Sequence, residues 1–141
     1  TPTATDYAGL PQLYFFKSNN ETGDAQKASL KKADELYAQL GEKYADAAEY
    51  ATFWRARVNN ARDDEQKEAL AKPYYEKLIE LYSTRTELNN SDKSRLKESY
   101  LYLISYYARV ANDMAKAKEC AVKLLEVDPE NAVAKQVMEI K

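Results

Sequence analysis

One spacing recurs three times along this chain and limits its fold more than any other feature. In three segments, small or apolar residues stand at positions i, i+4 and i+7, which places them in one stripe on one face of an α-helix. The three stripes are Ala33, Tyr37 and Leu40; Ala71, Tyr75 and Leu78; and Ala117, Ala121 and Leu124. Each stripe needs another helix to cover it, so we expect an all-α fold.

A second helical segment precedes each stripe and brings its own apolar anchors. These anchors are Leu10 and Tyr14, then Trp54 and Val58, then Ile104 and Ala108. Only 3 Gly and 4 Pro interrupt the 141 residues, which favours helices throughout. The chain is therefore predicted to consist of helix pairs.

The third pair has the most regular spacing. Ala117 lies 12 residues after Ser105, and Pro129 lies 12 residues after Ala117. Together with Ile104, Ala108, Ala121 and Leu124, this pattern resembles the tetratricopeptide repeat, a helix–turn–helix unit of 34 residues. The runs FWRARVNN and LAKPYYEKLIEL are similar to a bacterial subset of these proteins. The resemblance implies a right-handed α–α superhelix, a solenoid of three helix pairs closed by a C-terminal capping helix.

The other two pairs fit the same pattern if insertions at the unit junctions are allowed. We expect one domain over residues 1–141, with units of about 6–45, 46–90 and 91–131 and a capping helix over 129–140. The predicted helices before the cap are 7–17, 25–41, 45–61, 64–82, 92–111 and 114–127. The predicted N-caps are Asp6, Asp24, Asp63 or Asp64, Ser91, Asp113 and Asp128.

Two prolines and one arginine depart from the pattern. Pro11 predicts a first helix that is short or broken, and Pro73 predicts a kink or restart near residues 70–73. Close helix crossing needs small side chains, as at Ser105. Arg55 and Pro11 occupy the corresponding positions of the other two units, so we expect looser crossings there.

Composition argues against several classes of function. The 21 Lys and Arg are interspersed among 23 Asp and Glu, with no basic patch for nucleic acid, and no apolar run could span a membrane. There is no histidine, and Cys120 is the single cysteine, so we expect no catalytic, metal or cofactor site. Carboxylates such as Glu76 and Glu80 are interpreted as ordinary helix-surface residues. The chain begins at Thr1 without a signal peptide, so we expect an excised piece of a protein of the bacterial cytoplasm or periplasm.

The resemblance implies a protein-interaction scaffold that binds a peptide or protein segment on its concave face, which the first helix of each pair lines. The residues predicted to bind are Tyr102, Tyr106, Arg109, Asn59 and Gln12. Exposed Tyr and Arg are typical anchors of interfaces. An alternative is that Tyr102 and Tyr106 pack against the inserted segment 84–91.

Some proteins of this family hold acidic chaperone tails with a clamp of Lys, Asn and Arg. The corresponding positions here include Ala8, Gln12, Phe53, Ser99 and Leu103, so no such binding is expected. A second class of function is a structural spacer or self-association module. A weak homo-oligomer would then form through the last helices, using Val133 and Val137.

Overall fold

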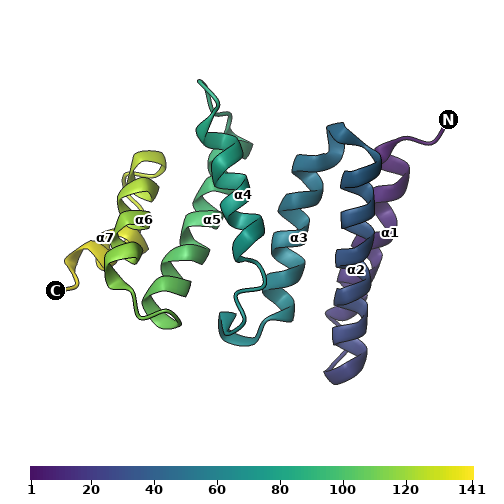
Figure 1. The fold of residues 1–141 in the computed structure, drawn as a ribbon, viewed down its shortest axis with the longest axis horizontal. Helices are drawn as coiled ribbons and strands as arrows, with labels where there is room; N and C mark the ends of the chain where they lie inside the picture. The colour runs from purple at the N-terminus through teal and green to yellow at the C-terminus, as the bar shows by residue number, and fades with distance from the viewer. The chain divides into compact units, whose positions relative to one another are not determined.

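The computed structural model describes all 141 residues, Thr1–Lys141, and contains α-helices without any β-strand (Figure 1). The all-α prediction is confirmed. Residues 1–74 form one compact unit and residues 75–141 form another. The helices are α1 Ala4–Ser18, α2 Gly23–Lys43, α3 Ala48–Arg62, α4 Lys72–Ser83, α5 Asn90–Arg109, α6 Met114–Val127 and α7 Ala132–Glu139.

The first unit is built by α1, α2 and α3 around the first predicted stripe. Ala33, Tyr37 and Leu40 of α2 are buried, together with Val58 of α3. Trp54 of α3 stacks on the Tyr37 ring, with 6.1 Å between ring centroids. Burial raises the pKa of Tyr37, so its hydroxyl stays protonated. The prediction that Tyr37 and Trp54 are packing residues is confirmed.

The second unit has the same construction. Ala117, Ala121 and Leu124 of α6 are fully buried against Ile104 of α5. The last helix, α7, adds Ala134 and Val137 to this core. Val133 and Ile140 are exposed.

The fourth helix begins later than predicted. Residues 63–71 form a loop in which Glu65, Gln66 and Ala69 have positive φ angles. The buried carboxylate of Asp63 accepts hydrogen bonds from the backbone N–H groups of Glu68 and Leu70, at 2.9 and 3.0 Å. Asp63 therefore stabilises the loop rather than capping an α-helix, and α4 begins only at Lys72.

The first helix is longer than predicted. It runs unbroken from Ala4 to Ser18 with Pro11 inside it and buried. Proline removes only the hydrogen bond to the carbonyl of Tyr7, and Tyr7 is exposed, so water can satisfy that carbonyl. The expectation of a short or broken helix was wrong.

The N-caps agree with the sequence at Asp113, whose side chain accepts from the N–H of Lys116. Elsewhere the cap lies a few residues from the predicted position. Asn89 caps α5 and Asn131 caps α7. At α1, Thr3 is the N-cap and the predicted residue Asp6 accepts a hydrogen bond from its backbone N–H.

Candidate protein-binding site

A groove of about 630 Å³ lies in the second unit, where α4, α5 and α6 meet. Its apolar lining comes from all three helices: Ile79 of α4, Tyr100 and Leu103 of α5, and Cys120 and Val122 of α6. Leu103 is buried and Val122 is 45% exposed. Ile79, Tyr100 and Cys120 are half-buried. The groove therefore presents part of its apolar lining to solvent, as ligand and peptide sites commonly do.

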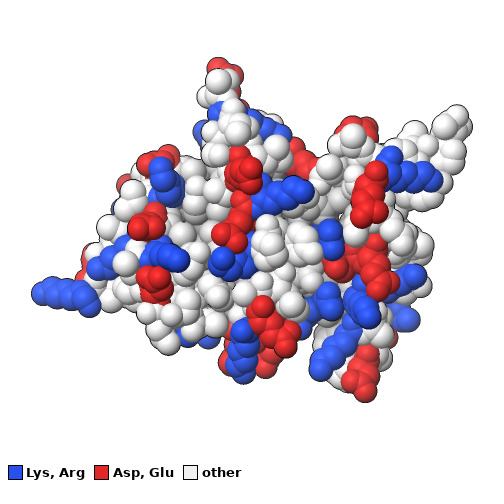
Figure 2. Space-filling view, viewed as in Figure 1, with Lys and Arg blue, Asp and Glu red and all other residues white.

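The charged lining residues of this groove are mostly acidic. Glu76 and Glu80, one helical turn apart, come from α4, and Glu119 comes from α6. Lys123 is the basic residue in the lining, and its ammonium lies 3.7 Å from the carboxylate of Glu126. Figure 2 shows an uncharged strip between the charged side chains over α4 and those over α6.

The groove follows from how each helix divides its faces. In α6 the stripe of Ala117, Ala121 and Leu124 is turned into the core, which leaves Val122 outside. In α4, Tyr75 and Leu78 are buried, which leaves Glu76 and Glu80 exposed. These positions follow the 3.6-residue period of a helix.

The floor of the groove is uncharged. Burial raises the pKa of the Tyr100 hydroxyl, and the nearby Cys120 and Glu126 raise it further. Tyr100 therefore stays protonated at neutral pH and can donate a hydrogen bond.

Tyr102, Tyr106 and Arg109, the predicted anchors on α5, do not form one exposed cluster. Tyr102 is only 5% exposed and packs on Tyr75 of α4, with 4.8 Å between ring centroids. The expectation of an exposed Tyr102 was therefore wrong, whereas the alternative packing of Tyr102 and Tyr106 against segment 84–91 stays a prediction. Tyr106 is half-buried beside the Tyr107 ring, and Arg109 is exposed. Binding by Tyr106 and Arg109 stays a prediction.

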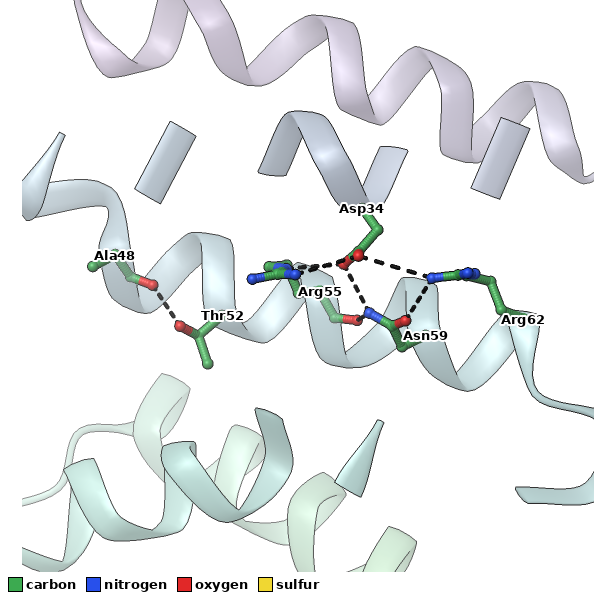
Figure 3. Close-up of polar contacts among 6 residues, drawn as sticks. All are labelled: Asp34, Ala48, Thr52, Arg55, Asn59 and Arg62. Carbon is green, nitrogen blue, oxygen red and sulfur yellow. Dashed lines mark hydrogen bonds and ion pairs between the residues drawn. The ribbon is translucent and has the colours of Figure 1, made fainter. Parts of the chain in front are cut away.

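Asn59, another predicted binding residue, is buried in a polar network of the first unit (Figure 3). Its side-chain amide donates to the Asp34 carboxylate and to the Arg55 carbonyl, both at 2.8 Å. Its side-chain carbonyl accepts from Arg62 at 2.9 Å. These contacts occupy Asn59 within the protein, so it is not available to a partner. Gln12 is half-buried on α1.

A second hollow, of about 460 Å³, lies in the first unit beside the 63–71 loop. It is lined by charges of both signs, among them Lys27, Lys31, Lys67 and Glu68. Lys67 is paired with Asp64 and Glu65. Seven of the nine residues that line this hollow are charged, so the groove of the second unit, with its apolar lining, is the stronger candidate for a protein ligand.

Sequence reasoning missed the groove residues. Val122 carried a signal, because it is an apolar residue outside the buried stripe of its own helix. Glu76, Glu80 and Cys120 were interpreted as ordinary surface or filler residues. Only the packing of α4 and α6 on the same helix shows that they line one groove.

The fold defines an all-α helical repeat of the tetratricopeptide type, a class that is typically non-enzymatic and serves protein interaction. The supporting match is the crystal structure of the C-terminal part of a TPR repeat-containing protein from the bacterium Cytophaga hutchinsonii. Its TM-score is 0.81 at 29% sequence identity, over 99% of this chain and 48% of that one. The chain thus spans about half the length of the structure it matches.

Two further comparisons gave no match. No family model matches the sequence, and no curated protein does. None of the helices is both long and apolar enough to cross a membrane.

Proposed function

We propose that this chain is a non-enzymatic scaffold that binds a segment of a protein partner, and that the groove between α4 and α6 holds that segment. The observation that carries the proposal is the apolar lining of Ile79, Tyr100 and Val122, partly open to solvent and bordered by glutamates. An apolar centre with a polar border is the usual anatomy of a protein interface.

The chemistry of the groove favours a basic amphipathic segment. Apolar side chains of the partner would cover Ile79 and Val122, and the apolar surfaces of both proteins would gain free energy by leaving water. Lys or Arg beside them would face Glu76 and Glu80 on one border and Glu119 on the other. Opposite charges at the border raise the association rate and select against acidic partners. A helical segment suits a groove formed between two helices.

The face of α5 that carries Tyr106 and Arg109 is a second proposed surface. In the resembled family the first helix of each pair lines the concave binding face, and α5 holds that place in the third pair. Arg109 is exposed and Tyr106 half-buried, so both can contact a peptide. The lining of the groove includes neither Tyr106 nor Arg109, so the two surfaces can be tested separately.

The test is a selection from a displayed random-peptide library with this chain as bait, followed by fluorescence polarisation of the enriched peptides. We expect apolar residues at i, i+3 or i+4 and i+7 with flanking Lys or Arg. Val122→Asp should weaken binding about tenfold or more, because it places a charge on the apolar lining. Val133→Asp on α7 is the matched control, since Val133 is 44% exposed and outside the groove.

The outcomes separate the proposals. Loss with Val122→Asp and no change with Val133→Asp supports the groove. Loss with Tyr106→Ala and Arg109→Ala, but not with Val122→Asp, overturns the groove in favour of the α5 face. If no peptide is enriched, a structural module becomes the better interpretation.

A further inference from the structure

The outer face of α1 carries the most exposed apolar side chains of the molecule. Leu10 and Phe16 are each 51% exposed, and Leu13 is 64% exposed. The buried residues of this helix, Pro11 and Ser18, lie on its other side, where Tyr7 packs on the Tyr44 ring of α2 with 5.8 Å between ring centroids. Three large apolar residues spaced i, i+3 and i+6 on one side of a helix are more than scattered surface exposure explains.

The charges of α1 are placed at the two ends of this face. Asp6 and Lys17 are the charged residues of the helix. Lys17 comes eleven residues after Asp6, which equals about three turns, so the two lie on one side. They share that side with Leu10 and Leu13. Asp6 is exposed, and the side chain of Lys17 is 63% exposed. A helix with one acid near its start and one base near its end is complementary to itself when antiparallel.

We propose that two copies of this chain form a homodimer in which the α1 helices pack antiparallel about a two-fold axis. In this register, a residue of one copy lies level with the residue of the other copy for which the two residue numbers add up to 23. Leu10 of one copy faces Leu13 of the other, and Asp6 faces Lys17. One register therefore pairs the apolar couple and the charged couple twice each, as a two-fold interface requires.

Two further features of α1 fit this interface. Gly9 lies on the same outer face, and a Cβ built there would meet nothing within 4 Å, so a second helix can approach closely. The groove of the second unit includes no residue of α1. The dimer is thus independent of the proposed function, and it would present two grooves to a multivalent partner.

The interface is a single helix pair, which buries less than the about 800 Å² per partner of a standard complex. We therefore expect a weak dimer, with dissociation in the range of about 1 to 100 µM. Sedimentation velocity from about 1 to about 200 µM should show the mass shift from monomer to dimer. A monomer throughout this range overturns the proposal.

Substitutions test the face and the register. Leu13→Asp should abolish the dimer, and its exposure leaves the fold intact. Lys17→Glu should weaken the dimer about tenfold, because Glu would face Asp6. Adding Asp6→Lys to the Lys17→Glu variant should restore the dimer affinity to within about threefold of that of the unsubstituted chain. That rescue occurs only in an antiparallel pair, since a parallel pair would face like charges in every variant.

The matched control is Lys93→Glu, an exposed charge reversal on α5 that should leave the dimer unchanged. Circular dichroism checks each variant, because Asp6 also takes part in the N-terminal cap. A dimer that survives Leu13→Asp overturns the proposal and moves the interface elsewhere, for example to α7. A dimer that is lost with Lys17→Glu and not restored by Asp6→Lys overturns the antiparallel register.

Discussion

Arg55 of α3 forms a two-point ion pair with Asp34 of α2. Its Nε donates to Oδ1 at 2.9 Å, and a terminal guanidinium nitrogen donates to Oδ2 at 3.3 Å (Figure 3). The guanidinium also lies over the Tyr74 ring, 4.6 Å from its centroid. Burial alone would lower the pKa of Arg55, but the hydrogen bond and charge of Asp34 raise it. A position where the resembled family favours a small residue is thus used for a charged contact between helices.

Removing one partner of this pair should destabilise the fold. With Arg55→Ala, the Asp34 side chain, only 13% exposed, loses its main partner. We expect a loss of about 1–3 kcal/mol in the free energy of unfolding, measured by urea denaturation. The control is Asp64→Ala, whose partner Lys67 is exposed, with an expected change within about 0.5 kcal/mol. Equal effects of the two substitutions would contradict the assigned role of the pair.

Tyr102 should behave as a core residue. Tyr102→Ala removes a ring that packs on Tyr75, so we expect a loss of about 3–5 kcal/mol in the free energy of unfolding. Tyr102→Phe keeps the ring and should cost less than about 1.5 kcal/mol. Tyr106→Ala, at a half-buried site, should cost less than Tyr102→Ala. Denaturation curves of the three variants give the comparison. If Tyr102→Ala leaves the free energy of unfolding unchanged, Tyr102 is not a core residue and becomes a candidate for binding again.

Asp128 should titrate below the ordinary range of an aspartate. The hydrogen bond from the Asn131 side chain, at 3.0 Å, is the main cause of its lowered pKa, and Lys97 contributes. A lowered pKa stabilises the fold above the ordinary value near 3.8, and this contribution is lost as the pH falls through the lowered pKa. Asn131→Ala should raise the pKa of Asp128, measured by NMR titration. Lys97→Ala should raise it less. If Asn131→Ala leaves the titration midpoint of Asp128 unchanged, the hydrogen bond from Asn131 is not the main cause of the lowered pKa.

Local spacing predicted the helix cores better than the helix ends. The stripes, Trp54 and the Asp113 cap could be read from the sequence because each depends on neighbours within one or two turns. The loop around Asp63 could not, because its hydrogen bonds to Glu68 and Leu70 compete with helical ones and only the folded chain decides between them. The groove could not be predicted from the sequence either, because it forms only where α4 and α6 both pack on α5. Tyr102 was misjudged because its covering ring, Tyr75, belongs to another helix.

Two glycines in helices should respond oppositely to substitution by alanine. Gly9→Ala adds a Cβ into open space and replaces a poor helix former, so we expect a gain of about 0.5–1 kcal/mol in stability. At Gly41, the added Cβ would lie 3.1 Å from the Ala51 Cβ, because α2 and α3 approach closely there. The backbone must shift to relieve that contact, so we expect Gly41→Ala to destabilise the fold by about 1 kcal/mol or more. Thermal and urea unfolding of both variants, at concentrations where the chain is monomeric, measures the difference. If both variants are equally stabilised, α2 and α3 do not approach as closely as the structure shows.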